Sequence, residues 1–195
     1  MRLAVVSAGL GVPSSTRLLA DRITASVRGE LASRGRPVEA TVVELRDLAV
    51  PIAHHLVTGF PPPALEEASL AVALADGLVA VTPVFGAGFS GLFKSFFDLL
   101  DPDALTGTPV LAAAGGTARH SLVLEHALRP LFAHLRARTV PTAVHAASED
   151  WGGAGDALTE DLPVRIGRAA RELAVLLDAP AADRAPQPYP ADLFA

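Results

Sequence analysis

Residues 3–17 read LAVVSAGLGVPSSTR, and this stretch decides the class of fold. Its first part, Leu3 to Ser7, is a nearly continuous apolar run, which is typical of a β-strand buried on both faces. A glycine-rich turn follows, and from Thr16 onward apolar residues recur every four positions, which indicates an amphipathic helix. These apolar residues are Leu19, Ile23, Val27 and Leu31. A strand, a turn and a helix in this order predict the opening of a βαβ unit.

The same alternation continues along the chain. Four further apolar runs predict strands over 38–45, 77–82, 108–113 and 140–146. Four further helices are predicted over 64–75, 91–100, 118–138 and 163–177. Pro130 should kink the long helix 118–138 or open a second segment, because proline removes a backbone donor.

Strands alternating with helices predict a flavodoxin-like three-layer α/β/α sandwich. We expect its five-stranded parallel sheet to have the order 2-1-3-4-5. Ligands of such sheets bind beyond the carboxyl ends of the strands, at the switch point between the first and third strands. The loops after the strands are therefore the places to look for a site.

Composition narrows the class of protein. The 195 residues carry a formal net charge of −5, which argues against nucleic acid as a partner, and they include no cysteine, which excludes disulfides and thiolate chemistry. No apolar stretch reaches membrane-spanning length, and the apolar N-terminal run is too short for a signal peptide, so we expect no membrane association and a cytoplasmic protein. One domain is expected over 1–180, with an extended or disordered tail rich in Pro, Ala and Asp over 181–195.

Three hydroxyl side chains stand at the start of the first helix: Ser14, Ser15 and Thr16. A helix N-terminus offers free N–H groups and a positive dipole, and hydroxyl groups add further donors. Ordinary N-capping would explain one of the three. We therefore expect a terminal phosphate dianion here. Ser14 stands where a dinucleotide fingerprint needs its third glycine, and no Walker lysine is present.

The loops after the third and fourth strands are suited to a flat ligand. Residues 82–98 read TPVFGAGFSGLFKSFFD, and residues 114–120 read AGGTARH. Gly86, Gly115 and Gly116 let the backbone approach a ring closely. Ser90 and Thr117 are each expected to cap the helix that follows.

Other side chains in these segments are expected to be structural. Phe93, Phe96 and Phe97 are predicted to lie in the core. We expect His120 to make a structural hydrogen bond rather than act as an acid or base. The spacing of the six histidines predicts no metal site.

Three motifs carry a resemblance to a known family: SST at 14–16, TPVF with SGLFKSFFD at 82–98, and GGTARHSLVLEHALRPLF at 115–132. They resemble the NADPH-dependent FMN reductase family, and more narrowly the FMN reductases that accompany luciferase-like flavin-dependent monooxygenases. The resemblance covers about residues 2–178 and implies FMN as the flavin and NADPH or NADH as the reductant. Members often carry serine where Gly86 stands, so a side-chain contact is not expected at that position.

The resemblance also implies roles for the candidate site residues. The FMN phosphate would be held by Ser7, Ser14, Ser15 and Thr16. The ring would be lined by Pro83, Val84, Phe85, Gly86, Gly115, Gly116 and Thr117. Hydride transfer is the cofactors' own chemistry, so no catalytic side chain is assigned.

Two other functions stay open from the sequence. One is an FMN-bound quinone or azo reductase, and the other is a flavodoxin-type electron carrier, whose surface is usually more acidic than a charge of −5 implies. If the protein is an FMN reductase, we expect a flavin-dependent monooxygenase as a partner that receives the reduced flavin. NADH and NADPH are not distinguished, because Arg17 and Arg119 fit a 2′-phosphate and an ordinary surface position equally well.

Trp151 and the predicted long helix each indicate a further feature of the protein. Trp151 either covers the flavin or nicotinamide or anchors its glycine-rich loop. Apolar residues in the long helix exceed what one sheet face needs, which predicts a homodimer or homotetramer. These residues are Leu122, Leu124, Leu128, Leu131 and Leu135.

Overall fold

A computed structural model describes residues 1–151 and 161–179 of the chain. Strands and helices alternate along it as the sequence predicts. In chain order the elements are β1 (Arg2–Ser7), α1 (Ser15–Ser33), β2 (Glu39–Glu44), the 3₁₀ helix η1 (Leu45–Leu48), α2 (Ala49–Thr58), α3 (Pro63–Ala73), β3 (Gly77–Phe85), β4 (Gly88–Phe89), α4 (Gly91–Asp98), β5 (Pro109–Gly116), the 3₁₀ helix η2 (Ala118–His120), the π-helix η3 (Leu124–Leu128), α5 (Arg129–His134), β6 (Arg138–Thr139), β7 (Val144–Ala147), the 3₁₀ helix η4 (Ser148–Trp151) and α6 (Leu162–Asp178). The predicted tail over 181–195 lies outside the described residues.

The central strands follow the order β2-β1-β3-β5 and are parallel to one another, which confirms the flavodoxin-like arrangement. The number of strands differs from the prediction, because the described sheet has seven instead of five. The predicted strand 140–146 is divided into β6 and β7, which both pair with β5. Pro141 offers no N–H to a neighbouring strand, and Thr142 instead donates its N–H and Oγ1–H to the Glu172 carboxylate at 2.7 and 2.8 Å.

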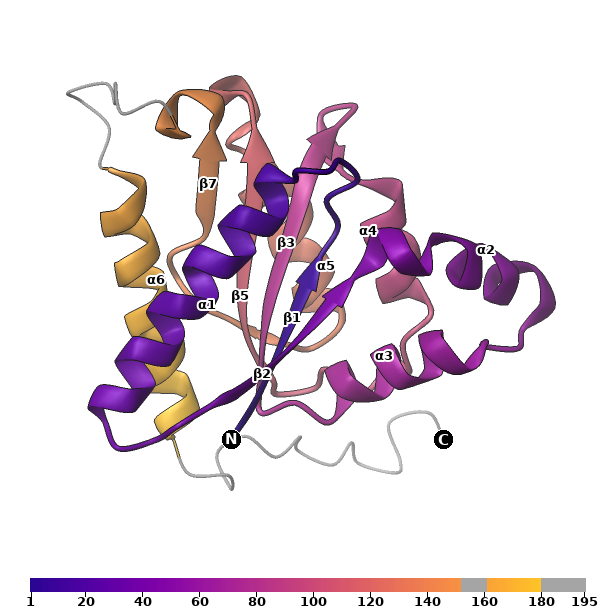
Figure 1. Cartoon of the computed structure of the whole chain (residues 1–195), viewed down its shortest axis with the longest axis horizontal. Helices are drawn as coiled ribbons and strands as arrows, with labels where there is room; N and C mark the ends of the chain where they lie inside the picture. The colour runs from indigo at the N-terminus through magenta and orange to yellow at the C-terminus, as the bar shows by residue number, and fades with distance from the viewer. Residues whose placement is uncertain (152–160, 180–195) are drawn as a thin grey trace, which may run out of the picture.

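Helices cover both faces of the sheet (Figure 1). On one face α1 and α6 pack together over Leu3 and Val5 of β1. On the other face α3, α4 and α5 pack over Ala4 and Val6, which the alternation of a strand directs to the opposite side. The core on this second face includes the predicted residues Phe93, Phe96 and Phe97, which are buried.

Two helical segments differ from the prediction. No helix was predicted over residues 49–58, where α2 lies. Only Ile52 of this helix is fully buried. The helix predicted over 118–138 consists of η2, η3 and α5. Pro130 lies in the first turn of α5, so the proline opens a second segment, which was one of its two predicted effects.

Most of the apolar surface of this segment faces the protein's own core. Leu124, Leu128, Leu131 and Leu135 are buried, whereas Leu122 is 61% exposed. The leucines of 118–138 therefore give no support for a homodimer or homotetramer. Among the described residues, no helix combines the length and the apolar character needed to cross a bilayer.

Candidate functional site

The loops predicted to form the site meet at one edge of the sheet, where β3, β5 and β7 end together (Figure 1). Strand pairing places Ser7 beside Val81, and Pro83 beside Gly115. Because all these strands run parallel, the loops that follow them lie next to one another, with the start of α1 at the same edge. The structure therefore brings the three predicted loops together.

The start of α1 is held by its own side chains. Ser14 is the N-cap, and its Oγ accepts a hydrogen bond from the Arg17 N–H at 3.1 Å. The preceding loop folds so closely over this turn that a Cβ at Gly9 would lie 2.0 Å from Ser14 Oγ and 3.0 Å from Thr16 Cβ. A side chain at residue 9 would displace Ser14 or Thr16, so the loop lies close against the first turn of α1.

Ser7 supplies a polar group beneath this turn. Its side chain is fully buried, and its Oγ has no hydrogen-bond partner among the described residues. Ser7 alternates with Leu3 and Val5, so it faces the α1 side of the sheet. A buried hydroxyl without a partner costs about 1–3 kcal/mol, which a ligand oxygen would recover.

These groups together fit a phosphate. The first N–H groups of an α-helix have no acceptor within the helix, and its dipole favours an anion. We call the loop 8–13 with Ser7, Ser14, Ser15 and Thr16 the phosphate cradle. Thr16 is buried and Ser15 is exposed, so the hydroxyl groups lie at different depths.

Arg17 is engaged by two carboxylates. Its guanidinium lies 2.8 Å from Asp21 and 2.5 Å from Glu44, and these hydrogen bonds raise the pKa of Arg17 above its ordinary value. Arg119, the other arginine considered for a 2′-phosphate, is exposed on η2. The pairing of Arg17 with Glu44 joins residues far apart in the sequence, and the spacing of the first helix gives no signal for it.

The loop after β3, for which the sequence predicted no strand, is a hairpin. Val84 pairs with Phe89 and Phe85 with Gly88 in antiparallel register. Gly86 and Ala87 form the turn with φ of +56° and +65°, the left-handed conformation of a two-residue hairpin turn. The turn presents Phe85, which is half exposed, at the carboxyl edge of the sheet.

Ser90 fixes the other end of this hairpin. It caps α4 as predicted, since its Oγ accepts a hydrogen bond from the Phe93 N–H at 3.1 Å. Its own N–H donates to Thr82 Oγ1 at 3.0 Å. The hairpin is therefore tied to the end of β3 and to the start of α4.

The loop after β5 contacts this hairpin. A Cβ at Gly116 would lie 3.2 Å from Val84 Cβ, whereas at Gly115 the nearest atom, the Ala146 carbonyl oxygen, would be 3.9 Å away. The predicted cap by Thr117 is wrong, because its side chain caps no helix. Thr117 Oγ1 instead lies 3.1 Å from His120 Nδ1, which confirms a structural hydrogen bond for His120.

An ion pair for which the sequence gives no local signal supports the end of β7. The Arg165 guanidinium lies 2.9 Å from both carboxylate oxygens of Asp150, and Asp150 Oδ2 accepts a hydrogen bond from the Ala147 N–H at 2.8 Å. Burial and the nearby charge of Arg165 lower the pKa of His145 on the same strand. Burial therefore favours the uncharged form of His145.

Trp151 packs on the α1 side of the molecule. The Arg22 guanidinium carbon lies 4.8 Å from the centre of its ring, within reach of a cation–π interaction. The ring also contacts the core beneath α1 and α6. This geometry favours the interpretation of Trp151 as an anchor of its loop.

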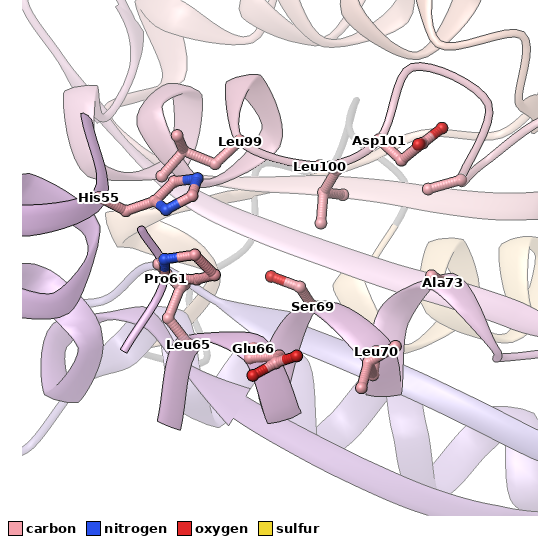
Figure 2. A pocket seen from close by; sticks show the side chains of 11 residues that line it. His55, Pro61, Leu65, Glu66, Ser69, Leu70, Ala73, Leu99, Leu100 and Asp101 are labelled. Carbon is pink, nitrogen blue, oxygen red and sulfur yellow. The ribbon is translucent and has the colours of Figure 1, made fainter. Parts of the chain in front are cut away.

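Two cavities lie away from this edge. Figure 2 shows one of about 200 Å³, in which Leu65 and Ser69 of α3 face Leu99 and Leu100 at the end of α4, with His55 of α2 beside them. A second cavity, of about 630 Å³, lies between α4 and α5. Neither includes a predicted site residue. Within the part of the chain that the structure describes, no cluster of three or more His, Asp or Glu residues could hold a metal ion.

The sheet order, with loops gathered at the carboxyl edge of its strands, defines the class as a flavodoxin-like α/β protein. Residues 1–152 match the family described as NADPH-dependent FMN reductase, and the chain belongs to this family. Its members are oxidoreductases that use FMN as the flavin and a reduced nicotinamide as the reductant.

Three relatives illustrate the match. The NADH-dependent FMN reductase SfnF of Pseudomonas fluorescens is 38% identical over 177 residues, which cover 90% of this chain and 91% of the relative. The FMN reductase (NADPH) of Pseudomonas aeruginosa is 38% identical over 176 residues, with the same coverage of 90% and 91%. The crystal structure of an oxidoreductase from Corynebacterium diphtheriae superposes with a TM-score of 0.85 at 49% identity, covering 90% of this chain and 96% of that one.

Proposed function

We propose that this protein transfers a hydride from NADH or NADPH to FMN, whose phosphate is held in the cradle at the start of α1. The observation that carries the proposal is the buried Ser7 hydroxyl, which has no hydrogen-bond partner among the described residues and lies at the same edge of the sheet as the start of α1. A terminal phosphate has enough oxygens to accept hydrogen bonds from the backbone N–H groups of α1 and from Ser7, Ser14, Ser15 and Thr16. Gly9 closes the cradle over them.

We propose that the two neighbouring loops hold the ring. Pro83, Val84, Phe85 and Gly86 would lie along one side of it. The second group would be Gly115, Gly116 and Thr117. The contact between Gly116 and Val84 gives these loops one fixed relative position, which favours a rigid, flat ligand.

The chain's contribution to the reaction is binding and orientation. Hydride transfer between a reduced nicotinamide and the flavin is supplied by the cofactors once they are bound. We assign no acid or base to a side chain, since the hydride step itself does not need one. The hairpin of β3 and β4 and the Thr117–His120 hydrogen bond fix the surface on which the ring would rest.

The proposal includes both NADH and NADPH as possible reductants. Of the two relatives at 38% identity, one is named for NADH and the other for NADPH. Because Arg17 is held by carboxylates, Arg119 is the better candidate for contact with a 2′-phosphate. An Arg119→Ala variant should then lose catalytic efficiency with NADPH and keep it with NADH.

We also propose that reduced FMN passes to a partner flavin-dependent monooxygenase, that the reductase works in the cytoplasm and that it is a homodimer or homotetramer. Support for self-association comes from α2 and the loop after it, where Val50, Val57 and Phe60 are at least 75% exposed. A second copy would remove this apolar surface from water. Gel filtration should give a mass of two or four times 20.1 kDa.

Steady-state oxidation of NADH and of NADPH, with and without added FMN, tests the function. Oxidation that depends on added FMN supports a reductase that releases its flavin. Turnover that requires a quinone and ignores FMN would indicate a quinone reductase, and no oxidation at all would leave an electron carrier.

A Ser7→Ala variant tests the site separately from the reaction. Its hydroxyl has no hydrogen-bond partner among the described residues, so the free energy of unfolding should stay equal or rise slightly. FMN binding should weaken about tenfold, since a hydrogen bond to a charged phosphate contributes about 1.5–3 kcal/mol. Unchanged FMN affinity would place the phosphate elsewhere.

A further inference from the structure

Glu44 is an acidic residue beside the cradle that the proposed function leaves unexplained. It is the last residue of β2, and strand pairing places it directly beside Ser7. Neighbouring strands lie about 4.8 Å apart, so this carboxylate-bearing residue flanks the floor of the cradle. Its side chain is only 18% exposed, which limits the screening of its charge by water.

Glu44 also pairs with Arg17, a cation in the first turn of α1. A second cation, Arg46, donates to the Gly11 carbonyl of the cradle loop at 3.1 Å. Arg17 already donates its backbone N–H to Ser14 Oγ. Its guanidinium forms ion pairs with both Glu44 and Asp21, so one cation faces two carboxylates. The three side chains together carry a net charge of −1 at the edge of a proposed phosphate site.

A carboxylate in this position opposes phosphate binding in two ways. It repels a dianion, and it occupies hydrogen-bond donors of Arg17 that would otherwise be free to reach the phosphate. Both effects act in the same direction, and both depend on the charge of Glu44.

We propose that Glu44 is an affinity-setting residue, whose carboxylate weakens phosphate binding in the cradle so that FMN exchanges rapidly. This inference rests on the proposed function, because it needs FMN in the cradle. It assigns the rate of flavin release to an ion pair beside the phosphate rather than to contacts with the ring. A reductase that hands its flavin to another protein needs such release.

The test compares Glu44→Gln with the wild-type apoprotein, using FMN and riboflavin titrations followed by flavin fluorescence. Loss of the charge should tighten FMN binding about tenfold and slow FMN release in stopped-flow displacement. Riboflavin has no phosphate, so its affinity should stay within about twofold. Asp21→Asn is the matched control, since Asp21 contacts the same guanidinium from the exposed helix surface, and its effect on FMN should be smaller.

The outcomes separate this inference from the proposed function. FMN binding that is unchanged or weaker in Glu44→Gln overturns the inference and leaves the reductase proposal standing, as does equal tightening of FMN and riboflavin. A wild-type protein that binds neither flavin overturns both. If Glu44→Gln unfolds, Glu44→Thr removes the same charge with a side chain suited to the end of a strand, and FMN binding that is unchanged or weaker in that variant would equally refute the inference.

Discussion

Replacement of Gly9 by alanine would disturb the phosphate cradle at one point and leave the ring loops untouched. The added Cβ would lie 2.0 Å from Ser14 Oγ and 3.0 Å from Thr16 Cβ. The Ser14 side chain can rotate away, but it then gives up the hydrogen bond that it accepts from the Arg17 N–H. Thr16 is buried and has less freedom to move.

The size of the effect follows from these contacts. Loss of a serine N-cap costs about 1 kcal/mol, and crowding of a packed site costs a further 1–3 kcal/mol. We therefore expect Gly9→Ala to lower the free energy of unfolding by about 2–4 kcal/mol. Because Ser14 and the α1 N–H groups are displaced, FMN binding should weaken about 10–100-fold, as expected when a charge-assisted hydrogen bond is lost.

Urea denaturation and flavin titration measure the two effects on the same protein. Gly29→Ala in α1 is the matched control, since no atom lies within 4 Å of its added Cβ. That variant should gain about 0.5–1 kcal/mol from helix propensity and bind FMN normally. The reasoning about the cradle is refuted if Gly9→Ala weakens FMN and riboflavin by the same factor.

Two further predictions concern the other loops. Gly116→Ala should weaken flavin binding and lower the free energy of unfolding by about 1–3 kcal/mol, because its Cβ would crowd Val84. Gly115→Ala should change neither quantity by more than about 0.5 kcal/mol. Thermal unfolding and FMN titration of the two variants test this, and equal effects would count against it. Burial lowers the pKa of His145 below 6.5, so between the lowered value and 6.5 only the unfolded chain takes up the proton. Stability should therefore fall as the pH drops through this window, and His145→Gln should flatten the dependence in denaturation curves at pH 5–8; an unchanged slope would show that His145 is not its source.

The first strand and helix could be predicted because their signals are local. The apolar run of β1 and the four-residue repeat of α1 each specify one element, and both were found near their predicted bounds. The order of the sheet followed from the alternation of elements. The prediction of one continuous helix over 118–138 was wrong, because a continuous apolar repeat does not reveal where the chain turns. Helix α2 was not predicted, because only Ile52 in it is fully buried.

The candidate site divides in the same way. Serine-rich and glycine-rich loops are visible in the sequence, so the residues that the structure brings to one edge could be named in advance. The pairing of Glu44 with Arg17 could not be predicted, because the two residues are far apart in the sequence. Thr117 was expected to cap a helix, and its hydrogen bond with the nearby His120 depends on how the loop folds. The unpartnered hydroxyl of Ser7 is also invisible in the sequence, because burial depends on how β1 is covered.

The division of the last strand affects how the sheet meets other chains. Sheet edges expose unpaired N–H and C=O groups, on which a strand of another molecule can add. Here the border beyond β5 is made of a two-residue strand and a four-residue strand, separated by a segment in which Pro141 has no N–H to offer. Neither piece is long enough to serve as a template, so this interruption protects the sheet from edge-to-edge aggregation.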